Sequence, residues 1–258
     1  MKARLAKKLA HTPINWLAPF WTNNFFYLDR HDARLKKHLS SGGRENRENN
    51  VLTKIYSMQK IMFNDKYGLT EAVLTKRKTQ TRRIITSKEM LDFIKMFDTP
   101  ASAFTIYERF MLDPGLKWGF LCNRRVMRYQ MNETVAIAQP YADITPQLDW
   151  VKCMIRKEKL GWNNKMFVRA EDLPHHIRIT KISIERLQDI SEEDCMKEGI
   201  WRDDNVGFEG TTYWYHGLAN SSFRTPQEAY ASLIDRISGK GTWASNPYVF
   251  VYDFELIN

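Results

Sequence analysis

The chain has 258 residues, which is long for one ordinary domain and short for three. Hydrophobic residues make up 43% of it and charged residues 27%, a balance that excludes wholesale disorder. Three cysteines, none in a CxxC pair, exclude a disulfide framework and argue against a cysteine-built zinc site. The short apolar runs predict neither a signal peptide nor a membrane span, so we expect a cytoplasmic protein.

The positive charge is concentrated at the start of the chain. The formal net charge is +9, and residues 1–50, with ten Lys or Arg and four Asp or Glu, supply +6 of it. Such a balance favours polyanionic partners. Within this segment, residues 2–9 and 32–39 predict two short helices, with an aromatic-rich stretch between them.

The polar run at 42–50 has the composition of a linker. We therefore predict a boundary near residue 50, which separates a helical N-terminal extension at 1–50 from a main domain at 51–258. The aromatic residues of the extension either pack against the main domain or dock a protein partner or a membrane surface.

Hydrophobic periodicity and turn residues give the elements of the main domain. In chain order they are a strand at 60–63, a helix at 69–76, a basic loop at 76–83, strands at 135–138 and 177–184, helices at 192–198 and 226–237, and a strand at 248–256. Residues 86–131 are interpreted as an insertion. These elements favour an α+β fold with a small mixed sheet or barrel over a doubly wound parallel sheet.

Local chemistry predicts several boundaries within these elements. Asn132 suits a left-handed turn, and a slip of the alternation near Thr180–Lys181 predicts a bulge in the strand. Ser191 and Thr225 stand at N-cap positions of the helices that follow them. Thr86, with Glu three residues later, predicts a capping box at the start of the insertion's first helix.

Several motifs with well-defined chemistry are missing from the sequence. It contains no GxGxxG, no Walker motif, no HExxH and no GxSxG, which disfavours dinucleotide-binding, NTP-hydrolysing, zinc-protease and α/β-hydrolase classes. His175 and His176 are adjacent, so in a strand they point to opposite faces, and no third ligand stands at metal spacing. We therefore predict no metal and no cofactor.

The basic run at 76–83 is the first candidate site. It is either a solvated charge run or a loop that contacts phosphates, with guanidinium and ammonium donors and threonine hydroxyls. Its candidate nucleotide-binding residues are Lys76, Arg77, Arg82 and Arg83. Tryptophans are most often core residues, but four of them could stack on bases: Trp162, Trp201, Trp214 and Trp243.

Glu198 is the second candidate. It stands at the C-terminal end of the predicted helix 192–198, where outward-pointing carbonyls disfavour a carboxylate. The N-terminal end already carries three acidic residues. Glu198 is therefore expected either to pair with a cation or to have a functional role.

Four ordered blocks from about residue 60 onward resemble the ASCH domain of the PUA-like superfamily, most closely the type found in phages and mobile elements. The blocks are Gly68–Arg83 with its Lys-Thr-Gln-Thr-Arg-Arg run, Glu133–Ile137, Ile184–Ile200, and Trp243–Val251. The chain has Asn132-Glu133 where the family usually has Gly-Asp. Residues 1–50 lie outside the resemblance.

The resemblance implies a compact β-barrel with flanking helices and a basic cleft that binds RNA or a modified nucleotide. Some short bacterial members are amidohydrolases that remove the acetyl group from acetylated cytidine. Their catalytic Lys, Thr and Glu correspond to Lys78, Thr81 and Glu198 here.

The chemistry of these side chains agrees with such a triad, because a threonine hydroxyl needs a base to become a nucleophile. Like charge from neighbouring arginines would lower the pKa of Lys78. Glu198 would then orient groups or transfer a proton. Three functions remain open: binding of RNA or a modified nucleotide, deacylation of a nucleoside, and docking of a protein partner through the N-terminal extension.

Overall fold

A computed structural model describes residues 58–105, 127–144, 161–204, 210–217 and 222–257. The chain divides into two compact units. The larger comprises 58–86 and 127–258, and the described part of the other is 87–105. The predicted extension at 1–50 and the boundary near residue 50 lie outside the described residues.

The larger unit is built on a five-stranded sheet with the order β1-β3-β4-β7-β2. Its strands are β1 (Gln59–Ile61), β2 (Gln80–Ile84), β3 (Thr134–Ile137), β4 (His176–Arg186) and β7 (Tyr248–Ile257). β1 pairs with β3 in parallel, and the other pairs are antiparallel. A second sheet holds β5 (Trp201–Asp203) and β6 (Thr212–Trp214). The predicted α+β class is confirmed, and the described strands form an open sheet rather than a closed barrel.

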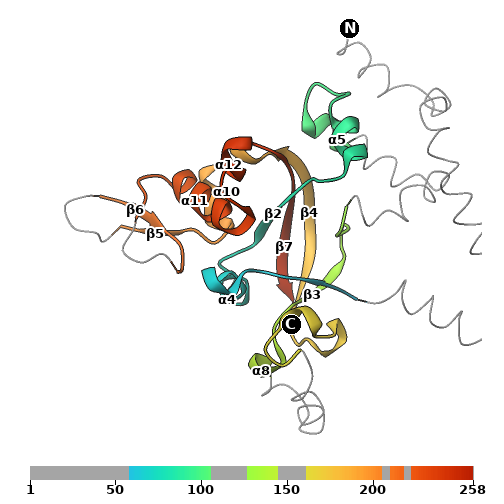
Figure 1. Cartoon of the computed structure of the whole chain (residues 1–258), viewed down its shortest axis with the longest axis vertical. Helices are drawn as coiled ribbons and strands as arrows, with labels where there is room; N and C mark the ends of the chain where they lie inside the picture. Colours follow the sequence, from blue (N-terminus) through green and yellow to red (C-terminus); the bar gives the residue numbers. More distant parts are fainter. Residues whose placement is uncertain (1–57, 106–126, 145–160, 205–209, 218–221, 258) are drawn as a thin grey trace, which may run out of the picture. The chain divides into compact units, whose positions relative to one another are not determined.

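The described helices of the two units are short. The α-helices are α4 (Leu69–Leu74), α5 (Lys88–Ile94), α8 (Tyr141–Ile144), α10 (Glu192–Lys197), α11 (Pro226–Ser238) and α12 (Thr242–Ser245). The 3-10 helices are η2 (Asp65–Tyr67), η4 (Lys165–Phe167), η5 (Ala170–Asp172) and η6 (Leu187–Asp189). Strands β2, β7 and β4 run side by side, and α10, α11 and α12 gather on one side of them, next to the β5–β6 hairpin (Figure 1). No helix in the described ranges is both long and apolar enough to cross a bilayer.

The two longest strands, β4 and β7, form the centre of the core. Their register slips between Ile179 and Lys181, which confirms the predicted bulge. Apolar side chains of both strands are buried, because alternate residues of a strand share one face. α11 buries Ala229, Tyr230 and Leu233 and contacts α10, α12 and β6. This scaffold fixes β2, which pairs with β7 along its whole length.

Most of the predicted helix and turn boundaries are confirmed. Asn132 has a φ of 60°, and the hydroxyls of Ser191 and Thr225 cap α10 and α11. The capping residue of α5 was predicted one position too early: Ser87, not Thr86, accepts the hydrogen bond from the backbone of Met90. The two adjacent hydroxyls carry the same local signal, which explains the error.

The predicted basic loop is wrong in its second half. Residues Gln80–Ile84 form strand β2, in which Thr81 lies opposite Tyr252 of β7. The sequence hid this strand because its buried positions are polar: Gln80, Thr81 and Arg82 are all nearly inaccessible to solvent. Apolar alternation, the usual signal of a half-buried strand, is therefore absent.

Thr225 provides a test of the helix-cap assignment. Replacing it with alanine removes the hydroxyl that accepts from the backbone of Glu228 at 3.2 Å. We expect the free energy of unfolding to fall by about 1 kcal/mol. Thr225→Ser keeps the hydroxyl and should leave stability nearly unchanged. Urea denaturation of the two variants measures the difference, and equal midpoints would contradict the assignment.

Candidate functional site

Lys78 and Glu198 form a buried ion pair between the chain entering β2 and the end of α10. Glu198 is the C-cap residue of α10, and the backbone of Thr79 donates to the carbonyl of Lys197 at 3.0 Å, which brings the two segments together. Lys78 Nζ donates to the carboxylate of Glu198 and, at 2.8 Å, to its backbone carbonyl. Lys78 is 2% exposed and Glu198 4%. Glu198 thus pairs with a cation, one of the two outcomes expected from its place at the helix end.

The environment of Lys78 lowers the pKa of its amine. Burial is the main cause and lowers the pKa of Lys78, while the charge and hydrogen bond of Glu198 oppose that shift. The charges of Arg83 and Arg82 lower the pKa further. The sequence predicted this effect of like charge, but not the larger effect of burial.

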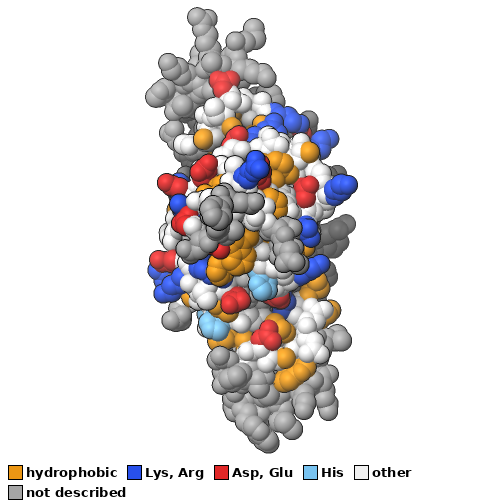
Figure 2. Space-filling model, turned by 90° about the vertical axis from the view of Figure 1, so that its left-hand side faces the viewer, with side chains coloured by type: hydrophobic (Ala, Val, Ile, Leu, Met, Phe, Trp, Pro, Cys, Tyr) orange, Lys and Arg blue, Asp and Glu red, His pale blue; other side chains and the backbone are white. Residues whose placement is uncertain are grey.

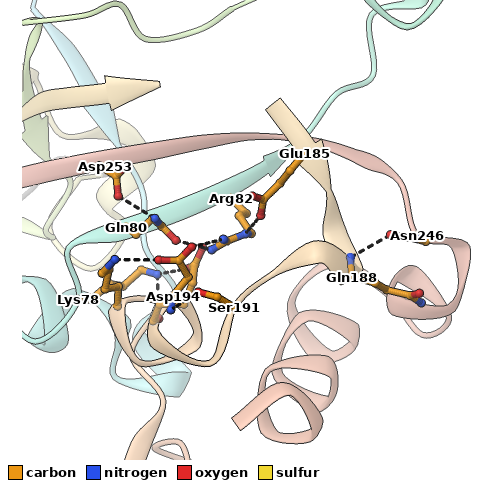
Figure 3. A network of polar contacts seen from close by, with 11 residues as sticks. Lys78, Gln80, Arg82, Glu185, Gln188, Ser191, Asp194, Asn246 and Asp253 are labelled. Atoms are coloured by element: carbon orange, nitrogen blue, oxygen red, sulfur yellow. Dashed lines mark hydrogen bonds and ion pairs between the residues drawn. The ribbon is translucent and has the colours of Figure 1, made fainter. Parts of the chain in front are cut away.

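Arg82 is held by three carboxylates and an amide. Its Nε donates to Glu185 at 2.7 Å, Nη1 to Glu198 at 3.2 Å, and Nη2 to Asp194 at 3.3 Å (Figure 3). Nη1 also donates to the side chain of Gln80 at 2.5 Å. The side chain of Arg82 is fully buried, so its guanidinium serves these carboxylates rather than an external phosphate.

The charges in this cluster shift one another's pKa values. Burial disfavours the charged form of Arg82, but Glu198 and Glu185 hold its pKa above the ordinary value. Burial raises the pKa of Glu185 even though Arg82 opposes it. Burial also opposes ionisation of Asp194, yet Lys197 and Arg82 keep its pKa low. The carboxylate of Glu198 is thereby fixed from both sides, by Lys78 and by Arg82.

A cavity of about 680 Å³ adjoins this ion pair. Many of its lining residues come from the segment after β1, from β2 and the chain entering it, and from α11, and Glu198 joins them from the end of α10. Its polar lining residues include Lys78, Thr81, Arg82, Arg83 and Glu198. Apolar walls are supplied by Met62, Phe63, Leu69, Leu187, Leu233, Ile234, Ile237 and Val249. The cavity thus combines apolar walls with charged groups that could orient a small-molecule ligand.

Thr81 lies on the edge strand β2 and is 5% exposed. Its neighbours Gln80 and Arg82 belong to the opposite face of β2, because successive side chains alternate. Within the described part of the chain, the Thr81 hydroxyl has no hydrogen-bond partner. Thr81 lines the cavity together with Lys78 and Glu198.

Two of the predicted site residues do not line this cavity. Lys76 is exposed, with a φ of 61°, and the guanidinium of Arg77 stacks on the ring of Trp201 at 3.8 Å. Trp201 also stacks on Trp214, with ring centroids 4.7 Å apart. Arg77 and these tryptophans thus form a separate stack on the β5–β6 hairpin.

The other two tryptophans pack inside the unit. Trp162 packs against a buried cluster that includes Tyr141, and Trp243 meets Tyr230 edge to face.

On the face shown in Figure 2, the described Lys and Arg side chains are interspersed with Asp and Glu rather than gathered in one basic tract.

The partners of Arg82 were not predicted from the sequence. Glu185 and Asp194 are not among the predicted site residues, although both pair with Arg82. A usable signal was present: acidic residues are dense between 185 and 198, and the basic run 76–83 has no acidic residue to pair with. The opposite charges of the two segments indicate that they attract each other, but not which residues form ion pairs.

Neither a metal nor a known relative accounts for the site. No group of three or more His, Cys, Asp or Glu residues in the described ranges is placed to hold a metal ion. No family model, no curated protein and no solved structure matches the chain. The function is therefore argued from the cavity and its residues.

Proposed function

We propose that the cavity beside β2 binds an acylated nucleoside of the cytidine type and that Thr81, Lys78 and Glu198 hydrolyse its amide bond. One observation carries this proposal: a buried lysine with a lowered pKa, paired with Glu198, lines the same cavity as an unpartnered threonine hydroxyl. The resemblance to ASCH amidohydrolases supplies the substrate class.

The same proposal assigns the larger unit to the PUA-like class. Its support is the four sequence blocks together with the approach of the sheet's two ends. Arg83 of β2 donates to the carbonyl of Met62, just beyond β1, at 2.8 Å, and Phe63 packs on Phe254 of β7 with ring centroids 5.8 Å apart. These contacts lie across the opening between the two edges of the sheet.

The reaction needs only the groups of this chain and one water. The neutral amine of Lys78 takes the proton of Thr81 as Oγ1 bonds to the acyl carbon. The amide C–N bond then breaks, and the leaving nitrogen takes that proton from Lys78. Water next attacks the Thr81 ester, which releases the free acid and returns the hydroxyl proton. Glu198 orients the amine, and Arg82 keeps Glu198 in place.

Binding of RNA or a nucleotide without turnover is the second candidate. It is favoured by the charge of the cavity lining, which holds five cationic side chains (Lys66, Lys78, Arg82, Arg83, Lys165) and two carboxylates (Asp65, Glu198). The docking of a protein partner through residues 1–50 lies outside the described residues.

Hydrolysis of acetylated cytidine tests the first candidate. We expect the wild-type protein to release acetate and cytidine, measured by chromatography, and Lys78→Met to lower kcat/KM by about 10²-fold or more, because the base is lost. Lys181→Met, an exposed change on β4, serves as the control. Binding of acetylated cytidine without turnover would leave the second candidate, and equal rates for Lys78→Met and wild type would remove Lys78 from the mechanism.

The pH dependence gives a further prediction. Since the neutral amine is the active form, kcat/KM should rise with pH through the pKa of Lys78. Burial lowers that pKa, so the plateau should be reached below the pH at which an exposed lysine titrates. Measurements of kcat/KM against pH, in buffers of constant ionic strength, would show this rise and its plateau. A rate that falls over this range would contradict the assignment of the base.

A further inference from the structure

Arg82 and Arg83 are adjacent in the sequence but have opposite surroundings. The nitrogens of Arg82 donate to three carboxylates. Arg83, on the other face of β2, donates to the carbonyl of Met62 at 2.8 Å and has no carboxylate partner among the described residues. Its Nε is buried and has no hydrogen-bond partner, the one such side-chain atom in the described ranges.

The cavity therefore has unneutralised positive charge. Of its cations, Lys165 pairs with Asp65 at 2.6 Å, while Lys78 and Arg82 pair with Glu198. Arg83 and Lys66 remain without a carboxylate partner in the described part of the chain. Two cations on the wall of one cavity give it an attraction for anions that the proposed hydrolysis does not use.

The chemistry of these two cations favours phosphate. A guanidinium presents a planar fork of N–H donors that matches the oxygens of a phosphate, and a lysine adds a point charge. A phosphate monoester carries close to two negative charges near neutral pH. Those charges would neutralise the two positive charges of Arg83 and Lys66. The volume of about 680 Å³ falls within the usual range for small-molecule sites.

We propose that the natural ligand of this cavity is phosphorylated, with Arg83 as the main phosphate contact and Lys66 as the second. The ligand class is thus a nucleoside monophosphate rather than a free nucleoside. The nucleoside part of this inference rests on the proposed function, whereas the phosphate part rests on the charges of the cavity.

Equilibrium binding of cytidine 5′-monophosphate and of cytidine tests the inference without requiring turnover. We expect calorimetry on the full chain to give an affinity for the monophosphate at least about tenfold above that for cytidine, weakening with salt. Arg83→Met should remove this preference while changing cytidine affinity little. Arg83→Lys, which keeps the charge and loses the fork, should retain part of it. Arg178→Met, which replaces an exposed side chain of β4, should leave it unchanged.

The outcomes separate this inference from the proposed function. Equal affinities of the wild-type protein for the monophosphate and cytidine would overturn the inference, as would a preference that survives Arg83→Met. Binding of a short single-stranded RNA but not of the mononucleotide would also overturn it. A preference that Arg83→Met abolishes supports it, even if acetylated cytidine is never hydrolysed, and that failure would count against the proposed function alone.

Discussion

Thr81→Val is expected to abolish hydrolysis of acetylated cytidine while leaving the fold and ligand binding intact. Valine has nearly the shape of threonine but no hydroxyl, so no acyl-enzyme bond can form. We expect kcat to fall by at least about 10³-fold, since removing the nucleophile of a catalytic unit removes the contribution of the whole unit. Release of acetate measures the rate, and calorimetry with cytidine measures binding.

Thr81→Val should disturb the surrounding structure very little. The Thr81 hydroxyl has no partner among the described residues, so valine breaks no hydrogen bond, and the pairing of β2 with β7 holds the backbone on both sides. Thr212→Val is the matched control, because Thr212 is also buried but lies on β6 and does not line the cavity. If Thr81→Val kept most of its rate, Thr81 would not be the nucleophile.

The parts of the fold that follow from local chemistry were predictable. The caps at Ser191 and Thr225, the left-handed turn at Asn132 and the bulge near Lys181 each depend on residues a few positions apart. Helix capping and strand bulges depend on residues that are close in the chain, so their signals can be read directly from the sequence.

The architecture of the site depends on long-range pairing, which the sequence does not display. Arg82 meets Glu185 and Glu198 across more than one hundred residues of chain. Burial of Lys78 and the assembly of apolar cavity walls from the segment after β1, from α11 and from β7 likewise arise only in the folded unit. Lys78, Thr81 and Glu198 could be selected beforehand because a family resemblance, not periodicity, places them together.

The cluster around Arg82 gathers several charges in a largely buried place. Glu198 pairs with both Lys78 and Arg82. Glu185 and Asp194 in turn balance Arg82. Buried charges of this kind are tolerated only when every member is paired. The stability of the larger unit should therefore depend strongly on Arg82.

Arg82→Ala is expected to lower the free energy of unfolding by about 3–5 kcal/mol, because it removes the buried cation shared by the buried carboxylate of Glu198 and the partly buried ones of Glu185 and Asp194. Arg178→Ala is the control: its pair with Glu255 spans 3.5 Å between side chains that are 48% and 55% exposed, so the loss should be no more than about 1 kcal/mol. Urea denaturation of both variants gives the comparison, and equal losses would mean that the cluster adds no special stability.

The pH dependence of the Arg82→Ala defect identifies its cause. Without the guanidinium, burial should raise the pKa of Glu185 further above its value in the unfolded chain. Groups with raised pKa values lose stability as pH increases through that range and regain it as pH falls. The difference from wild type should therefore be largest near neutral pH and shrink in mildly acidic buffer. A defect that stayed constant with pH would point to lost packing of the Arg82 side chain rather than to uncompensated carboxylates.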